Sequence, residues 1–187
     1  MPFDAQSEAL PVATFSAATD VVAILHERGW LGASHDVAAD AVAALDKWCL
    51  RAAELLGPHA ADRTALADLL AFVFAYDAPA LVREAPNQAV LAREGARDVI
   101  REFANRLLDA GELNSDRLKE IIDGIKGALP YRGRELFYPI RLALAGRAGE
   151  GELDRVILLL DAAASLDFAV PVKGARQRML EFCAAFD

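Results

Sequence analysis

The sequence predicts an all-α protein of about eight helices. Hydrophobic residues make up 55% of the 187 residues, many of them Ala and Leu, and aromatic residues only 7%. This composition favours helix over sheet. Apolar residues recur at helical spacing along most of the chain, and no segment alternates apolar and polar residues for long enough to predict a strand. A chain of this length can bury a full core without disulfides or metals.

The first third of the chain predicts an arm and two helices. Residues 1–15 have no apolar period and are expected to form a flexible arm. A first helix is expected from Ala17 to Arg28, ending at Gly29. A second is expected between Ser34, a suitable N-cap, and the stop at Gly57-Pro58. Its expected inward face comprises Val37, Ala41, Val42, Leu45, Trp48, Cys49, Ala52, Leu55 and Leu56.

The middle of the chain predicts one helix, a connector and a long helix. Asp62 or Thr64 is expected to start the first of these, and Asp77-Ala78-Pro79 to end it. Pro79 and Pro86 then predict an irregular connector around Asn87. The long helix is expected to run to Leu108, before Gly111. Its expected inward residues are Val90, Leu91, Val99, Ile100, Phe103 and Leu107.

The C-terminal part predicts four further helices. Ser115 is expected to cap one that ends before Pro130, and residues 131–138 are expected to form a loop. A short helix is expected from Pro139 to Ala145, followed by a loop over 146–151. The next helix is expected to carry Glu152 and Asp154 in its first turn, and a last one to run from Pro171 to Phe186. The expected organisation is a flexible arm (1–15), a helical bundle (16–111) and a smaller helical subdomain (112–187).

Charge is distributed unevenly along the sequence. The formal net charge is −8 and the pI about 4.9, which disfavours indiscriminate binding to nucleic acid. Residues 117–147, however, hold seven basic and three acidic residues, a local charge of +4. The rest of the chain holds 13 basic and 25 acidic residues, or −12. This asymmetry predicts a local patch that faces RNA.

Several site classes are not predicted. Cys49 and Cys183 lie far apart in apolar helical patterns and are expected to be buried, reduced thiols. The three His residues lack the paired spacing of a zinc site, so no metal is expected. The first basic residue is Arg28, unlike the start of a signal peptide. The longest apolar runs, such as 69–76, are too short to span a bilayer. We therefore expect a soluble, cytoplasmic protein without membrane contact.

One segment carries a family resemblance. Residues 133–146 read GRELFYPIRLALAG. This segment resembles the C-terminal anticodon-binding region of bacterial glutamyl-tRNA synthetases, which carry Gly-Lys-x-Leu-Phe-x-Pro-hydrophobic-Arg-x-Ala-Leu-Thr-Gly. The resemblance is best over 116–160 and weaker over 68–111. It implies an α-helical cage that contacts the anticodon arm of tRNA. Two positions depart from the pattern: Ala145 stands where Thr or Ser is usual, and Gly151-Glu152-Leu153 lacks a Pro.

The motifs of a synthetase catalytic region are not found in the sequence. Class I synthetases have His-Ile-Gly-His-like and Lys-Met-Ser-Lys-Ser-like segments, and His26-Glu27-Arg28-Gly29 matches neither. A Gly-rich phosphate loop and a nucleophile with an identifiable base are also missing. We therefore expect a non-enzyme that needs no cofactor.

The residues expected to contact RNA lie in and around the motif. They are Lys126, Tyr131, Arg132, Arg134, Tyr138, Arg141 and Arg147. Guanidinium groups in a loop can bind phosphate, and Tyr rings can stack on unpaired bases. Each assignment has a structural alternative. The two Tyr rings can pack against the short helix, Arg132 and Arg134 can be solvated charges, and Arg141 can bond loop carbonyls or pair with Glu135.

Two functions are compatible with these features. The first is a stand-alone, non-catalytic module that binds tRNA or a tRNA-like RNA. The second is a helical protein-interaction module that has lost RNA binding and assists a synthetase or forms a homodimer. The net charge of −12 outside the basic window favours the second, because it repels RNA at long range. The helix around Trp48 is a candidate contact surface, although that ring also suits the core.

Overall fold

The computed structural model describes residues 18–32, 39–147 and 152–186, and within these ranges the chain is helical and contains no strand. The all-α prediction is therefore confirmed, with ten α-helices in the described ranges rather than about eight. The expected arm over 1–15, the expected cap Ser34 and residue Val37 lie outside these ranges. The helices are α1 (Ala18–Glu27), α2 (Ala39–Leu56), α3 (Arg63–Phe74), α4 (Ala78–Arg83), α5 (Ala85–Leu91), α6 (Ala96–Asp109), α7 (Ser115–Ala128), α8 (Gly133–Ala145), α9 (Leu153–Ala164) and α10 (Ala175–Phe186), with a 3₁₀ turn, η1 (Gly57–His59), after α2.

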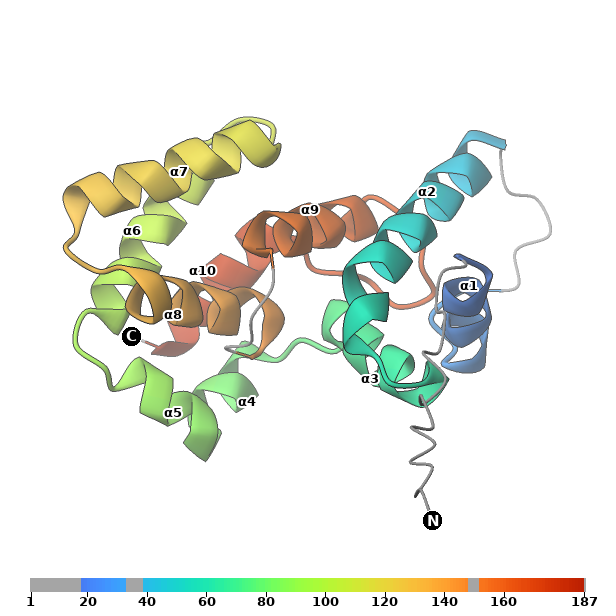
Figure 1. Cartoon of the computed structure of the whole chain (residues 1–187), viewed down its shortest axis with the longest axis horizontal. Coiled ribbons are helices and arrows are strands. Elements are labelled where there is room, and N and C mark those ends of the chain that lie inside the picture. The colour runs from blue at the N-terminus through green and yellow to red at the C-terminus, as the bar shows by residue number, and fades with distance from the viewer. Residues whose placement is uncertain (1–17, 33–38, 148–151, 187) are drawn as a thin grey trace, which may run out of the picture.

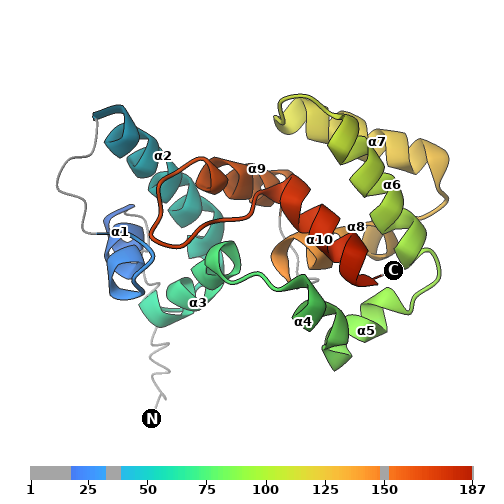
Figure 2. The same cartoon turned by 180° about the vertical axis from the view of Figure 1, so that it is seen from behind.

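The helices form two groups joined by α9 (Figures 1 and 2). Helices α1, α2 and α3 lie at one end of the molecule, and α4–α8 with α10 lie at the other. Helix α9 packs against α2 on one side and against α7, α8 and α10 on the other. Helices from both sides of the expected boundary at residue 111 pack together, since α6 contacts α8 and α4 contacts α10. The boundary itself stays a prediction.

An aromatic cluster fills the core of the first group. The rings of Trp30 and Phe74 stack with centroids 4.3 Å apart, and Phe168 meets Trp48 edge-on at 5.2 Å. The Trp48 indole N–H donates to the carbonyl oxygen of Leu159 on α9 (3.0 Å). Trp48 is 1% exposed, so this ring belongs to the core and does not form a contact surface.

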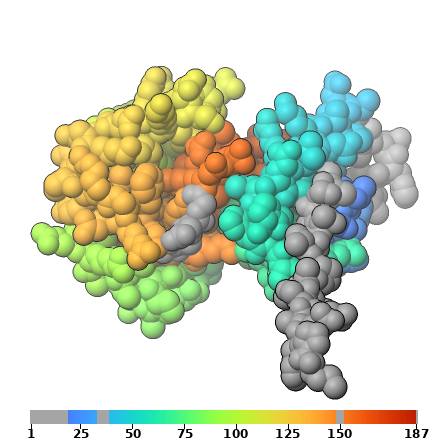
Figure 3. Space-filling model, in the orientation of Figure 1, coloured from blue at the N-terminus to red at the C-terminus, as the bar shows by residue number. Residues whose placement is uncertain are grey.

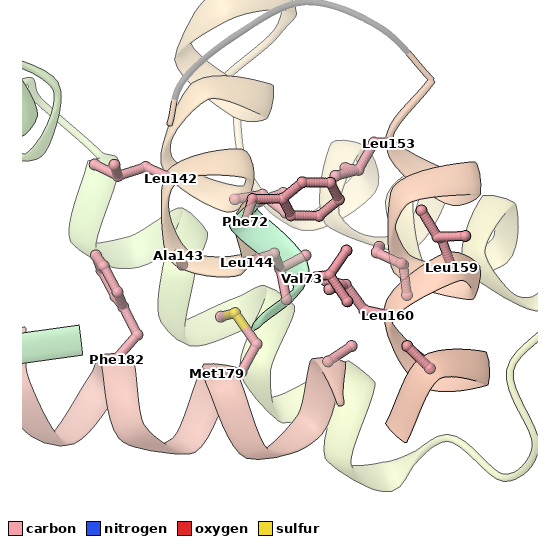
Figure 4. Close-up of a cluster of buried hydrophobic side chains, with 14 of the residues drawn as sticks. Phe72, Val73, Leu142, Ala143, Leu144, Leu153, Leu159, Leu160, Met179 and Phe182 are labelled. Carbon is pink, nitrogen blue, oxygen red and sulfur yellow. The ribbon is translucent and has the colours of Figure 1, made fainter. Parts of the chain in front are cut away.

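A second cluster joins the two groups (Figure 4). Side chains from the end of α3, from α8, from α9 and from α10 point toward one another there. Leu144 and Met179 are fully buried in it. Because α3 contributes together with three consecutive helices from the C-terminal part of the chain, this core holds α8 in place against the first group.

The start of α2 departs from the prediction. Trp48, Cys49 and Ala52 are buried as expected, but Ala41 and Val42 are exposed, Val42 by 45%. The helix has the expected apolar face, yet its first turns extend past the core that this face covers.

The predictions of an irregular connector and of one long helix after it are wrong. Pro79 and Pro86 lie in the first turns of the short helices α4 and α5, where a proline loses no hydrogen bond. The Asp77 side chain accepts from Ala80 N (3.0 Å) and so starts α4 instead of ending α3. Gly95, with φ +77°, separates α5 from α6, so the long helix is two helices.

Three boundaries in the C-terminal part are also wrong. Asn114, whose side chain accepts from Arg117 N (2.9 Å), caps α7 instead of Ser115. Helix α10 begins at Ala175, where Asp161 Oδ1 accepts the first backbone N–H (2.7 Å), and not at Pro171. Helix α8 begins at Gly133, which places Pro139 inside it. We attribute this longer helix to the stripe Leu136, Ile140 and Ala143, which continues through the proline and is fully buried.

Candidate nucleic-acid interface

A groove of about 670 Å³ lies between α7, α8 and the start of α9. We call it the α7–α8 groove. Its basic residues are Lys119, Lys126, Arg134 and Arg141, its acidic residues are Asp116, Asp123 and Asp154, and Phe137 and Tyr138 provide its aromatic rings. In the space-filling view α7 and α8 form the yellow-to-orange part of the surface, which α9 separates from the teal α2 (Figure 3). All four basic residues of the groove lie within the basic part of the sequence, residues 117–147.

Helical spacing brings the basic groups of the groove together. Lys119 and Lys126 are seven residues apart, two turns of α7, and therefore share a face. Arg134 and Arg141 stand in the same relation on α8. The predicted loop over 131–138 is correct for Tyr131 and Arg132 and wrong from Gly133 onward. Arg134 and Tyr138 are helical residues whose directions are fixed by α8.

An arginine and a tyrosine pair at the groove. The Arg134 guanidinium carbon lies 5.8 Å from the centre of the Tyr138 ring, within the range of a cation–π contact. Arg134 is exposed, while Tyr138 and Arg141 are partly buried. One side of the groove thus presents a positive charge beside an aromatic face, the combination that binds a phosphate next to an unpaired base.

Tyr131 and Arg132 do not line the groove. The Tyr131 ring packs over Gly95 at the start of α6, where any Cβ would overlap it. This tyrosine therefore has a packing role, although its partner is α6 and not the expected short helix. Arg132 Nη1 donates to the carbonyl oxygens of Leu129 (2.7 Å) and Tyr131 (2.6 Å), and its Nη2 to that of Lys126 (2.5 Å). Arg132 therefore satisfies carbonyls at the end of α7. Its expected contact with RNA stays a prediction.

Arg147 also lies outside the groove, against the end of α3. Its guanidinium carbon is 5.4 Å from the Phe72 ring centre, and Nη2 is 3.4 Å from the carbonyl oxygen of Leu69. Partial loss of hydration lowers the pKa of Arg147 below its usual value. The seven expected RNA contacts thus divide, since Lys126, Arg134, Tyr138 and Arg141 line the groove and the other three residues do not.

An acidic residue partners one of the basic groups in the groove. Lys126 Nζ lies 2.8 Å from Asp123 Oδ1, and both side chains are partly exposed. The hydrogen bond and charge of Lys126, with a smaller effect of Lys119, hold the pKa of Asp123 below its usual value. Asp123 is therefore an anion at neutral pH and offsets part of the positive charge of the groove.

Lys119 and Phe137 also line the groove, although neither was among the expected contacts. The signal for Lys119 was present in the sequence, because the spacing of Lys119, Ile122 and Lys126 marks one helix face. Phe137 would have been found by reading residues 133–138 as helix, since it lies one turn after Arg134.

Sequence reasoning also missed a buried junction behind the groove. Arg178 on α10 is completely buried. Its Nη1 donates to the carbonyl oxygens of Phe72 (2.9 Å) and Leu144 (2.8 Å), and its Nη2 to that of Val73 (2.6 Å). Its Nε donates to that of Lys173 (2.8 Å). We call this set the Arg178 junction. It connects the ends of α3 and α8 to α10.

Tyr76 completes the Arg178 junction. The Arg178 guanidinium carbon lies 4.5 Å from the centre of the Tyr76 ring, and the Tyr76 hydroxyl shares its proton between the carbonyl oxygens of Ala143 and Arg178. Burial lowers the pKa of Arg178 to about 10, a shift opposed by Tyr76 and Glu181. The guanidinium is thus still a cation at neutral pH. Backbone carbonyl oxygens take the place of the water molecules that would otherwise solvate it.

Comparison with known proteins identifies the family of this arrangement. Residues 23–167 match the family model of the anticodon binding domain. The chain belongs to the anticodon-binding-domain family. The match covers α2–α9, and therefore both helix groups and the groove.

Several relatives of this anticodon-binding-domain protein are glutamate–tRNA ligases. It is 32% identical over 76 residues to glutamate–tRNA ligase 1 of Caldicellulosiruptor saccharolyticus, and 33% identical over 73 residues to the ligase of Bacillus subtilis. The ligase of Geobacillus stearothermophilus is 35% identical over 71 residues. These alignments cover 38–41% of this chain but only 14–16% of each ligase. No solved structure matches the chain.

Metal sites and membrane spans are not found among the described residues. No group of three His, Cys, Asp or Glu residues that could hold a metal occurs within 18–32, 39–147 and 152–186. Among these residues, no helix is long and apolar enough to cross a membrane. Both cysteines are thiols, Cys49 buried as expected and Cys183 only partly buried.

Proposed function

We propose that this chain is a non-catalytic RNA-binding module that binds tRNA, or an RNA with a similar loop, in the α7–α8 groove. The single observation that carries the proposal is the gathering of Lys119, Lys126 and Arg134 beside two partly buried aromatic rings on a protein of the anticodon-binding-domain family. The proposal includes a cytoplasmic location, and it holds that these 187 residues suffice for binding.

The chemistry of the groove suits single-stranded RNA in a loop. Basic groups attract phosphates, and the Tyr138 and Phe137 rings offer faces on which unpaired bases can stack. The charge of −12 outside residues 117–147 repels nucleic acid elsewhere on the surface. RNA is therefore guided to one site instead of binding to the whole molecule.

The proposal excludes a catalytic contribution from this chain. The family match is to an anticodon-binding domain and not to a catalytic domain. We expect no glutamate-dependent exchange of pyrophosphate into ATP by the purified chain in the presence of tRNA, with a complete glutamate–tRNA ligase and tRNA as the positive control. Exchange above the background of a heat-denatured sample would contradict this part of the proposal.

Binding is tested by titrating the chain into labelled, unfractionated tRNA at several salt concentrations. We expect saturable binding. The logarithm of the association constant should fall linearly with the logarithm of salt concentration, with a slope of about −2 to −3 if three or four phosphates are neutralised. A blunt RNA duplex is expected to compete more weakly, because its bases are not available for stacking. Binding with no dependence on salt would contradict an interface made by the groove.

A protein-interaction module is the second candidate. Val42 and Leu50 on α2 are 45% and 46% exposed, and the chain outside the basic window carries a net charge of −12. On this alternative the chain assists a synthetase or forms a homodimer. Affinity capture with and without nuclease separates the two candidates, since a protein partner that survives nuclease treatment favours the second and co-purifying tRNA that disappears favours the first.

A further inference from the structure

The charge within the α7–α8 groove is nearly balanced. Four basic residues and three acidic residues line it, which leaves a net charge of +1. A surface evolved only to attract phosphate would not need these carboxylates, because each of them repels the RNA backbone and screens the adjacent basic group. The acidic residues therefore need an explanation of their own.

Asp123 contacts one of the basic groups directly. Its carboxylate lies 2.8 Å from Lys126 Nζ, and Lys119 also contributes to its environment. A phosphate that binds Lys126 must compete with a carboxylate already in place on the same helix. The ion pair is exposed, with 38% of the Lys126 side chain and 55% of the Asp123 side chain accessible, so the exchange is geometrically open.

We propose that Asp123 is a specificity-determining residue, which competes with RNA phosphates for Lys126 and so restricts the groove to RNA that also offers unpaired bases. This inference rests on the proposed function. A phosphate contact with Lys126 then gains little, because it displaces the Asp123 carboxylate. A loop gains additional free energy by stacking on Tyr138 and Phe137, which a duplex cannot do. A duplex binds through its phosphates alone and therefore depends on Lys126 more than a stacked loop does. The Asp123 carboxylate thus lowers affinity for the duplex more than for loops, which raises the preference for loops.

The same helix offers a matched control. Arg117 Nη1 and Glu120 Oε2 form an ion pair of 2.7 Å with the same spacing of three residues, but neither residue lines the groove. Asp123→Asn and Glu120→Gln each raise the net charge by one and each break one exposed pair on α7. Any difference between the two variants therefore reports the position of the charge in the groove and not the net charge of the protein.

The experiment measures the affinity of wild type, Asp123→Asn and Glu120→Gln for unfractionated tRNA and for a blunt RNA duplex. We expect Asp123→Asn to bind the duplex about two- to fivefold more tightly, since an exposed ion pair is worth little in free energy. The preference for tRNA over duplex should fall, and the salt slope of duplex binding should steepen by about 0.7–0.9, which corresponds to one additional phosphate contact. Glu120→Gln should leave the preference and the slope at their wild-type values.

The outcomes are distinguishable. Equal effects of Asp123→Asn and Glu120→Gln in a wild-type background that binds tRNA would overturn this inference and leave the proposed function intact. Weaker duplex binding by Asp123→Asn would overturn it as well. Failure of wild type and both variants to bind either RNA would overturn the proposed function, and this inference with it. Thermal unfolding of each variant confirms that all three proteins are folded.

Discussion

The Arg178 junction and the α7–α8 groove use the same residue types in opposite ways. In both, an arginine lies over a tyrosine ring, at 4.5 Å for Arg178 and Tyr76 and at 5.8 Å for Arg134 and Tyr138. Arg178 is completely buried and gives its N–H groups to backbone carbonyls. Arg134 is exposed at the edge of a groove. The local pair is similar, and burial decides its role.

This difference shows which basic charge is available to a ligand. The Arg178 cation is already satisfied by four hydrogen bonds and has no surface from which to reach RNA. It holds the end of α8, whose other end carries Arg134. Lys126 in the groove, by contrast, pairs with the exposed carboxylate of Asp123, which solvent and phosphate can replace. One region therefore sets the position of the helix, and the other offers its charge.

The largest effect is expected from removing the buried cation. Arg178→Met leaves the carbonyl oxygens of Phe72, Val73 and Leu144 without their donor in the core. We expect the free energy of unfolding to fall by about 3–5 kcal/mol, because several buried acceptors lose a charged partner at once. Urea unfolding followed by circular dichroism measures this change.

Arg178→Lys sharpens the same test. An ammonium group keeps the charge but cannot reach carbonyls on two helices and a loop in the plane of a guanidinium fork. We expect Arg178→Lys to lose most of the stability that Arg178→Met loses. Wild-type stability in the lysine variant would show that charge alone, and not the fork, holds the junction.

A pH dependence is expected from the buried side of the molecule. Burial, with a smaller effect of Asp46, raises the pKa of the Cys49 thiol from 9.0 to about 12. The folded protein keeps this proton above pH 9 while the unfolded chain loses it, so the stabilising contribution is complete below pH 9 and is lost as pH rises toward 12. Relative to Cys49→Ala, wild type should lose at most about 1.4 kcal/mol per pH unit in this window. Parallel stability curves for the two proteins would contradict the assignment.

The fold was predictable to the extent that it depends on local pattern. The helix class, the buried stripe of α6 and the start of α3 at Asp62 follow from spacing and capping residues that are close in sequence. The start of α8 was not predicted, since the burial of Leu136 and Ile140 overrides the local signal of Pro139. Likewise, a proline is common both in a connector and in the first turn of a helix, so the local sequence around Pro79 and Pro86 did not distinguish the two.

The candidate site was predictable only in part. Lys126, Arg134, Tyr138 and Arg141 were found because the resemblance marked their segment, and helical spacing could have added Lys119. Arg178 could not be found, because its partners Phe72 and Val73 lie 106 and 105 residues away in sequence. The hydrogen bonds of Arg132 to carbonyl oxygens at the end of α7 could not be predicted either, since they depend on the path of the chain after the helix.

The smallest effect on stability is expected in the groove, where the effect on RNA is largest. Lys126→Gln with Arg134→Gln should change the free energy of unfolding by no more than about 0.5 kcal/mol, because both side chains are accessible to solvent. The matched control is Lys47→Gln with Arg83→Gln, two exposed basic residues on α2 and α4 that lie outside the groove.

The salt dependence of tRNA binding by these two double variants tests the central claim most directly. We predict that the groove variant loses about tenfold in tRNA affinity and that its salt slope becomes shallower by about 1.4–1.8, the loss of two phosphate contacts. The control variant should keep the wild-type slope. Equal losses in both variants would contradict a specific groove and would show that RNA responds only to the net charge of the protein.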